Sequence, residues 1–533
     1  MAHPRSIFAC LVALLSAAVT PALAQKQGGT LKFYFFDSPA TMSIHEESTV
    51  AGQGPMMGVF NNLVMYDQAI EQSGLKTIVP DLASEWAWDQ AGTNLTFKLR
   101  SGVKWHDGKP FGARDVKCTW DLLMGKEGPN GESLRVNPRK TWYGNLQEVV
   151  VEADDRVTFR LKRPQPAFIA LIASGFSPVY PCHVNPAEMR RRPIGTGPFR
   201  FVEFKPNEIM KVARNKDYWK KDRPWLDAIE YRVIKNQSTG MLTFVAGDVD
   251  VTSPYYFQVP MLNDIKAQVP TAVCQLKASN VQRNVLINRE APPFDNADLR
   301  RAVALTVDRK AFIDTLTQGA GSIGGALLAP PEGVWGMPED IMRKLPGYDP
   351  DVAKNREEAR KLMAKAGYGP DKRLKIKVTT RNISVYRDPA VILIDQLKQI
   401  WIDAELEPID TTQWYPRVRK RDYAIGMNLT GNGLDEPDQA FYENYVCGSE
   451  SNWDGYCNPE IDKAIEAQSR EPDQEKRKNM VWDIERRLAE DVARPVLYHN
   501  RSGTCWHPYV KGFSPMINSI YNGMRMEDVW LDR

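Results

Sequence analysis

Short stretches in which apolar and polar side chains alternate recur along the first half of the chain. Residues 95–100, LTFKLR, have an apolar side chain at every second position, and the same period occurs at residues 157–161 and 229–233. This period of two is typical of strands with one buried face. We also expect a strand in the apolar run of residues 31–36 and a helix at residues 53–66.

After residue 294 the pattern changes to that of amphipathic helices. Five helices are predicted, at residues 299–317, 350–366, 388–402, 459–469 and 472–489. Asn458 followed by Pro459 is a typical helix start, and Gly367 is a typical helix end. Strands are predicted between the helices, at residues 374–380 and 422–430. The second half is therefore predicted to be α/β, whereas the first half is richer in strands.

Two connecting segments indicate how the halves are joined. The chain has 533 residues, more than one core usually organises, so we expect about two to four domains. Residues 281–290, VQRNVLINRE, lead from the first half into the second, and residues 493–500, ARPVLYHN, lead back. Two crossings would restrict the movement of the halves to opening and closing, as in a hinge.

Residues 1–24 have the features of a secretory signal. The basic residue Arg5 precedes an apolar run, and residues 22–24, Ala-Leu-Ala, form a small-residue cleavage site. The run is shorter than the roughly 20 residues that a bilayer span needs. Cys10 lies ahead of most of the run, whereas a lipid-attachment cysteine would follow it. We therefore expect a soluble mature chain that begins at Gln25 and carries no lipid anchor.

The nearly balanced charge argues against nucleic acid as a partner. The chain has 69 Lys and Arg residues and 66 Asp and Glu residues, a formal net charge of +3. Nucleic-acid-binding domains usually carry a clear basic excess. No stretch after residue 24 is apolar enough to cross a membrane. We therefore expect neither nucleic acid nor a membrane span in the mature protein.

Several motifs that could indicate enzymatic chemistry lack the required context. Residues 319–324, GAGSIG, have the spacing of a dinucleotide fingerprint, but a predicted helix precedes them where a strand is needed. His106 and Asp107 are neighbours in a predicted tight turn, so their side chains should point apart, and we interpret both as structural. No histidine pair has metal-ligand spacing, so we expect no metal site and no cofactor. A secreted hydrolase would lack its nucleophile and base, or its metal centre.

Six of the seven cysteines follow the predicted signal. Cys447 and Cys457 lie close together in the loop CGSESNWDGYC, where we expect a disulfide in an oxidising compartment; two free thiols are the alternative. Cys118 lies in a predicted helix and is interpreted as a buried apolar residue. The sequence leaves the state of the others open, namely Cys182, Cys274 and Cys505.

Four segments, in the same order, resemble one family of proteins. In residues 81–123 a strand leads into the turn GVKWHDG and then into a helix with an Asp-Val start. The others are RRPIGTGPFRF at 191–201, NKDYWKKDRPWLDAIEYRVI at 215–234 and LRRAVALTVDRKAFID at 299–314. Together they resemble the signature of the family 5 extracellular solute-binding proteins, which are the dipeptide, oligopeptide and nickel receptors of ATP-driven importers.

The resemblance implies an α/β, two-lobe periplasmic binding protein fold of type II, similar to the large cluster C group. Its first lobe is discontinuous and contains an extra subdomain. On this chain the expected boundaries are residues 25–280 and 498–533 for lobe I, about 67–190 for the subdomain, 281–290 and 493–500 for the hinge crossings, and 291–492 for lobe II.

The resemblance also implies a function without chemistry. A periplasmic receptor would capture a di- or oligopeptide between its lobes and deliver it to the permease of an ABC importer, whose separate subunits hydrolyse ATP. We expect this receptor to be a monomer. The same fold could bind a nickel complex, haem, an opine or an oligosaccharide, or could act as a ligand sensor or chaperone without transport.

A peptide receptor needs an acid for the ligand ammonium and a guanidinium for its carboxylate. Residues 430–438, TGNGLDEPD, correspond to the place where the family's dipeptide receptors keep an Asp, but Asn432 or Gly433 stands there and Asp435 follows slightly later. Arg381 and Arg387 lie near the place of the carboxylate-binding Arg. For each arginine, simple surface solvation is an equal alternative.

Aromatic residues near predicted strand ends are further candidates, because ligands of open α/β lobes collect there. Trp414 follows the predicted strand at residues 408–412, and Tyr255 and Tyr256 follow the turn GDVDV at residues 247–251. Ordinary core packing is about as plausible as ligand contact for each of them.

Overall fold

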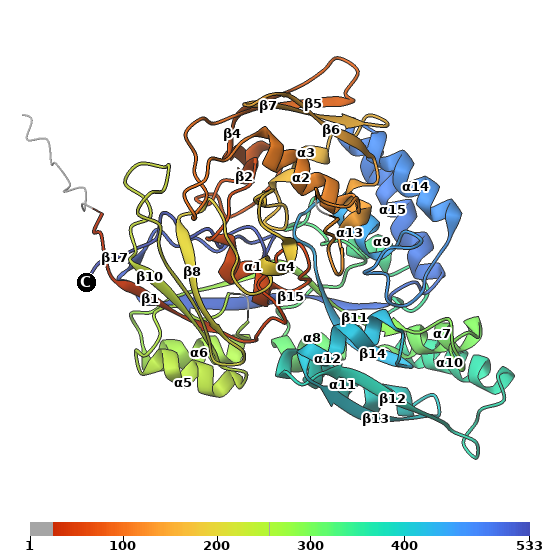
Figure 1. The fold of residues 1–533 in the computed structure, drawn as a ribbon. Helices are drawn as coiled ribbons and strands as arrows, with labels where there is room; N and C mark the ends of the chain where they lie inside the picture. The colour runs from red at the N-terminus through yellow and green to blue at the C-terminus, as the bar shows by residue number, and fades with distance from the viewer. Residues whose placement is uncertain (1–24, 130, 255) are drawn as a thin grey trace, which may run out of the picture.

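The computed structural model describes residues 25–129, 131–254 and 256–533. The predicted signal, residues 1–24, and the candidate Tyr255 lie outside the described residues. The described chain forms two lobes joined by long strands (Figure 1). The residue limits expected for the lobes, the subdomain and the hinge crossings stay predictions.

The first lobe is built on a four-stranded mixed sheet in the order β1-β10-β9-β8. Its strands are β1 (Thr30–Phe35), β8 (Phe199–Lys205), β9 (Ile209–Arg214) and β10 (Ala228–Val233). Only β1 and β10 are parallel. The alternation seen in the sequence places Phe33 and Tyr231 side by side in the core, with ring centroids 5.6 Å apart.

Three helices accompany this sheet, namely α1 (Val50–Met57), α5 (Gln237–Val245) and α6 (Val259–Gln268). The prediction of one helix at residues 53–66 is wrong in its second part. Helix α1 ends at Met57, and the apolar residues that follow include the short strand β2 (Val64–Tyr66), which pairs with β3 (Ile78–Pro80). A short apolar run does not distinguish a buried strand from a helix by its period alone.

A second four-stranded sheet, antiparallel throughout, lies at the top of the view in Figure 1. Its order is β4-β5-β7-β6, with β4 (Ala83–Trp88), β5 (Asn94–Leu99), β6 (Leu146–Ala153) and β7 (Arg156–Leu161). Helix α2 (Ala113–Leu123) packs on it, and the ring of Trp120 meets that of Phe159 edge to face at 4.9 Å. The helices α3 (Phe168–Ala173) and α4 (Pro186–Met189) follow.

The turn at His106 and the turn at Gly195, which belong to two of the four sequence motifs, lie against each other next to this sheet. His106 accepts a hydrogen bond at Nδ1 from the Gly195 amide (3.3 Å), and its Nε2 lies 3.0 Å from the carbonyl oxygen of Gly197. A Cβ at position 195 would lie 1.9 Å from the Val59 carbonyl oxygen, so only glycine fits there. Asp107 instead contacts His183 at 2.7 Å. His106 and Asp107 therefore point to different partners.

The second lobe contains a five-stranded sheet in the order β13-β12-β14-β11-β15. Its strands are β11 (Val273–Ile287), β12 (Leu374–Arg381), β13 (Ile402–Ile409), β14 (Ile425–Gly431) and β15 (Val496–Trp506). The long antiparallel pair β11 and β15 extends back to the first lobe, where Phe257 bridges to Gly503 and Val251 to Trp506. In Figure 1, β15 lies across the middle of the molecule between the two parts.

Nine helices of the described chain lie in this half, some against the sheet and the last three against core residues of the first lobe. They are α7 (Ala297–Thr306), α8 (Arg309–Thr317), α9 (Glu339–Met342), α10 (Val352–Lys365), α11 (Ser384–Lys398), α12 (Thr411–Arg419), α13 (Pro437–Asn444), α14 (Pro459–Arg470) and α15 (Gln474–Glu490). The helix predicted at residues 299–317 is two helices, because Asp308 caps the second by accepting from the Ala311 amide.

The described residues contain three disulfides. Cys447 and Cys457, the pair expected from the loop sequence, are bridged across 10 positions. Cys118 is bridged to Cys182, so its interpretation as a free buried residue is wrong. The third bridge joins Cys274 to Cys505 between the paired strands β11 and β15.

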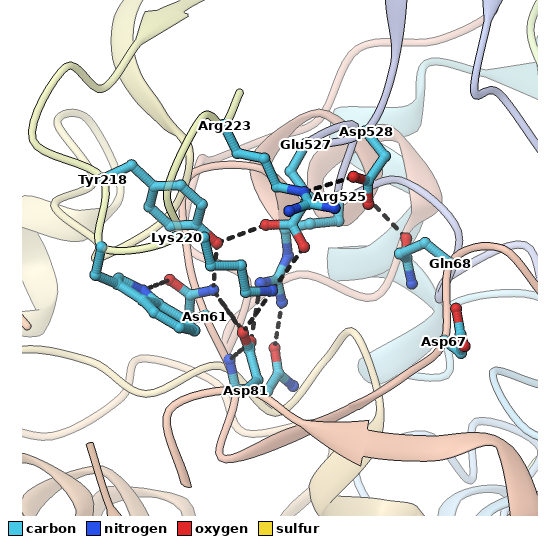
Figure 2. Close-up of polar contacts among 12 residues, drawn as sticks. Asn61, Asp67, Gln68, Asp81, Tyr218, Lys220, Arg223, Arg525, Glu527 and Asp528 are labelled. Carbon is cyan, nitrogen blue, oxygen red and sulfur yellow. Dashed lines mark hydrogen bonds and ion pairs between the residues drawn. The ribbon is translucent and has the colours of Figure 1, made fainter. Parts of the chain in front are cut away.

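A buried cluster of charged side chains anchors the C-terminal segment to the first lobe (Figure 2). Arg525 donates to Asp81 at 2.9 Å, and both side chains are fully buried. Lys220 lies 3.4 Å from Asp81 and 2.6 Å from Glu527, which also accepts from the Tyr218 hydroxyl at 2.6 Å. Burial opposes the charge of Asp81, but Arg525 and Lys220 hold its pKa below the usual value. Opposite charges are therefore matched within this cluster.

Candidate ligand-binding site

A cavity with an empty volume of about 980 Å³ lies between the two lobes. Residues 48–51 at α1, residues 254 and 256, and residues 520–521 form one wall. The other wall comes from β11, from the ends of β12 and β14, and from α11, α12 and α13. The parallel strands β12 and β14 point their carboxyl ends at the cavity, which is where open α/β sheets usually bind ligands.

Aromatic rings supply much of the apolar lining. Phe36 and Tyr256 stack with centroids 4.7 Å apart, and Tyr415 meets Trp453 at 5.6 Å. Phe176 and Tyr521, whose ring centroids lie 4.7 Å apart, line the same cavity. Such rings offer apolar area together with polar edges, so the site suits a ligand that has an apolar body.

Arg381 lines the cavity, but its charge is already matched. It forms a buried ion pair with Asp37 of the first lobe and donates from Nε to Thr411 Oγ1 at 3.0 Å. Burial opposes the charge, yet the neighbouring Tyr386 and Asp37 hold the pKa of Arg381 above its usual value. The pair thus links the two lobes at the edge of the cavity.

Two other sequence candidates lie away from the cavity. Arg387 is exposed and contacts Asp388 at 3.7 Å, which corresponds to the solvated alternative. Trp414 is fully buried and packs with Leu286, Val418 and Trp453. Neither side chain lines the cavity, and the hypothesis that Arg387 and Trp414 contact the ligand stays a prediction. Trp414 is the fourth residue of α12, on the face that packs into the core.

The candidates in residues 430–438, Asn432 and Asp435, also lie outside the cavity between the lobes. Asn432 is buried and donates to the Ala326 carbonyl oxygen at 3.2 Å. Asp435 accepts from the Val334 amide at 2.8 Å and lines a different pocket, beside Trp335. Burial raises the pKa of Asp435 to about 7. Asn432 and Asp435 thus lie outside this cavity, and their assignment to the ligand site stays a prediction; Tyr256 and Arg381 are the two described candidates that line the cavity.

Glu443 is an acid of the cavity that the sequence analysis did not select. It lies on α13, one turn after Gln439, which also lines the cavity and donates to Glu443 at 3.3 Å. Burial raises the pKa of Glu443, and the nearby Arg139 partly opposes that rise. Residues four apart share a helix face. The useful signal was thus the i, i+4 pair on the first helix after β14.

Arg283 is a second residue that the sequence analysis missed. It lies on β11, is 3% exposed and lines the cavity. Its guanidinium carbon lies 5.6 Å from the centre of the Tyr498 ring. Its Nε has no hydrogen-bond partner among the described residues. The available signal was an arginine inside a segment predicted to be a buried crossing strand, since buried arginines are rare unless paired.

Comparison with known proteins identifies the family. Residues 77–452 match the sequence profile of the bacterial extracellular solute-binding proteins, family 5. The chain is 26% identical over 549 aligned positions to di/tripeptide-binding protein 1 of Pseudomonas aeruginosa, covering 96% of this chain and 97% of that protein. The chain therefore belongs to the family 5 solute-binding proteins, as its signature motifs predicted.

Solved structures agree with the fold. The periplasmic binding protein DppA of Helicobacter pylori, solved with the peptide STSA, superposes with a TM-score of 0.82 at 20% identity, covering 95% of this chain and 99% of that one. The protein AgaA of A. tumefaciens R10, solved with agropinic acid, gives a TM-score of 0.79 at 22% identity, covering 95% and 99%. The predicted two-lobe fold is thus confirmed.

The described residues were also considered for metal-binding groups and for membrane-spanning helices. Within residues 25–129, 131–254 and 256–533, no group of three or more His, Cys, Asp or Glu side chains is arranged to hold a metal ion. In the same part of the chain, no helix combines the length and apolar character of a membrane span.

Proposed function

We propose that this protein is the periplasmic receptor of an ABC importer, exported by residues 1–24 and acting as a monomer. It captures a small solute between its lobes and delivers it to the permease, while separate subunits hydrolyse ATP. The observation that carries the proposal is the cavity of about 980 Å³ with walls from both lobes, in a chain of a solute-binding family. A ligand that contacts both lobes stabilises the closed form, which the permease can then recognise.

A di- or oligopeptide, or a peptide-like solute, is the proposed cargo. The pairing of β14 with β12 ends at Gly426, but β14 continues to Gly431. Residues 428–431 of this free edge line the cavity. An extended peptide backbone can hydrogen-bond to such an edge. The peptide named in the structure of the Helicobacter pylori protein supports this choice.

A non-peptide cargo is the second candidate, and one observation favours it. In the family's dipeptide receptors an Asp occupies the place of Asn432 or Gly433, and Asn432 here bonds to Ala326 instead of facing the cavity. The ammonium group of a bound peptide would have to use Glu443, the acid of α13 that lines the cavity. The agropinic acid in the structure of AgaA illustrates a non-peptide solute in this fold.

Native mass spectrometry of the mature protein, purified without unfolding, tests the proposal directly. We expect a retained solute whose mass identifies its chemical class, and calorimetry with di- and tripeptide mixtures should then give saturable binding. Binding of an opine or sugar panel in place of peptides would select the second candidate. Binding of ligand without any physical complex with a permease would favour a sensor.

A further inference from the structure

Arg283 differs from every other buried arginine among the described residues. Seven arginine side chains of the described chain are buried. Six of them donate a hydrogen bond to a carboxylate, an amide oxygen, a hydroxyl or a backbone carbonyl, namely Arg139, Arg309, Arg381, Arg477, Arg494 and Arg525. Arg283 makes no hydrogen bond or ion pair with the described residues, and its guanidinium carbon lies 5.6 Å from the centre of the Tyr498 ring.

An unmatched guanidinium is unfavourable in this position. Burial removes the water that would otherwise solvate the charge, and a single ring face compensates for only part of that loss. Natural buried charges are therefore usually paired. Because Arg283 lines the cavity, an acceptor on a bound solute could complete its hydrogen bonds.

The local backbone directs Arg283 to this place. The pairing of β11 with β15 has irregularities between Ala278 and Gln282 and again between Arg283 and Asn284. Bulges of this kind often re-aim a side chain beside a site. Asn428, on the neighbouring strand β14, also lines the cavity and has an amide nitrogen without a described partner. Two buried donors are thus open in one cavity.

We propose that Arg283 is the residue that binds the carboxylate of the solute. The inference rests on the proposed function and specifies its cargo as a solute with one carboxylate and an apolar body. A guanidinium can bind a carboxylate through two parallel hydrogen bonds. Glu443 in the same cavity disfavours a second anionic group, and the aromatic lining accommodates the apolar body. Arg381 is excluded as the carboxylate-binding residue because its guanidinium already forms an ion pair with Asp37.

Calorimetry with paired probes tests the carboxylate. The probes are a mixture of hydrophobic di- and tripeptides with free C-terminal carboxylates, the same mixture with C-terminal amides, and inorganic phosphate. The native protein should bind the acids about 10- to 100-fold more tightly than the amides. Arg283→Gln should remove this preference, and Arg283→Lys, which keeps the charge but not the two-pronged geometry, should keep part of it. Phosphate should not compete with the acids.

The unfolding temperature of the ligand-free variants separates a binding role from a structural one. If Arg283 awaits a ligand, ligand-free Arg283→Gln should unfold at the same temperature as the native protein or higher, because an unmatched buried charge is removed. A lower unfolding temperature together with an unchanged acid preference would overturn the proposal in favour of a structural role on Tyr498.

The other outcomes are also decisive. Equal binding of acids and amides by the native protein would overturn the carboxylate site but leave solute capture intact. If phosphate competes with the same affinity as the acids, the ligand group that binds Arg283 would be a phosphate and not a carboxylate. Failure of every peptide probe, with no retained solute in the purified protein, would contradict the proposed function itself.

Discussion

Two buried arginines of this molecule, Arg525 and Arg283, have opposite electrostatic surroundings. Arg525 lies in the first lobe among Asp81, Lys220 and Glu527, where each charge has a partner of opposite sign (Figure 2). Arg283 lies in the cavity between the lobes and has no such partner among the described residues. Matched charges in the interior support the fold, whereas an unmatched one beside a cavity indicates that something else completes it.

The difference also concerns movement. The Arg525 cluster joins segments of a single lobe, so opening of the cavity leaves it intact. Other ion pairs connect the two lobes, and they include Arg381 with Asp37, at the cavity, and Lys235 with Asp410. Those pairs must separate when the lobes move apart. Charge pairs in this protein therefore serve two purposes, to hold a lobe together and to favour closure.

The largest expected effect is on the matched cluster. Arg525→Gln leaves Asp81 buried with too little positive charge, and breaking such a pair typically costs about 3–5 kcal/mol of unfolding free energy. Urea denaturation measures the change. Arg223→Gln is the matched control, because Arg223 contacts Asp528 in the same region but is 41% exposed; its effect should stay below about 1 kcal/mol. Equal losses in both variants would contradict the distinction between the buried and exposed pairs.

The next effect concerns closure. Asp37→Asn removes the partner of Arg381, and opening of the lobes then relieves the burial of that guanidinium. We expect the closed form to lose about 1–3 kcal/mol relative to the open form. Small-angle scattering of the ligand-free protein should show a larger radius of gyration. Lys235→Gln, which removes the more exposed link between the lobes, should have a smaller effect; an unchanged radius for Asp37→Asn would argue against a closing role.

Glu443→Gln examines the second charge in the cavity. If Glu443 holds a ligand ammonium, the variant should bind peptides with a free N-terminus about 10-fold more weakly and N-acetylated peptides equally well. Because burial raises the pKa of Glu443, the carboxylate of the native protein is lost at a higher pH than usual. Affinity for free peptides should therefore fall as the pH falls, and this dependence should vanish in the variant. Calorimetry at several pH values measures both results, and a persistent dependence would point to another group.

The smallest expected effect is at Asp435. Its pKa is about 7 in the folded protein, above its usual value, so folding favours the protonated form. The native protein should therefore lose stability as the pH rises from about 4 to 8, and Asp435→Asn should lose less, because the raised pKa values of Glu47, Glu436 and Glu485 remain in the variant. Because the side chain is partly accessible to solvent, we expect a difference of only about 1 kcal/mol at pH 8. Thermal unfolding at both pH values measures it, and ligand affinity should be unchanged because Asp435 lies outside the cavity.

The sequence alone determined the family, the strands with a period of two and most helix positions. The turn at His106 depends on residue types in a short stretch, so it is readable from the chain, whereas the close approach of Gly195 to Val59 joins residues far apart in the sequence. Helix ends were less accurate: the predicted helix at 299–317 is divided by the cap at Asp308. The local cap signal competes there with a continuous apolar pattern.

Only the tertiary structure decided which charges face the cavity. Asp435 and Trp414 lie in the expected segments, but the direction of each side chain depends on contacts with Val334 and Leu286, far away in the sequence. Arg283 looks in the sequence like any arginine of a strand. Its significance arises because the lobes bury it without supplying an acceptor, and the pairing of buried charges is a property of the assembled chain.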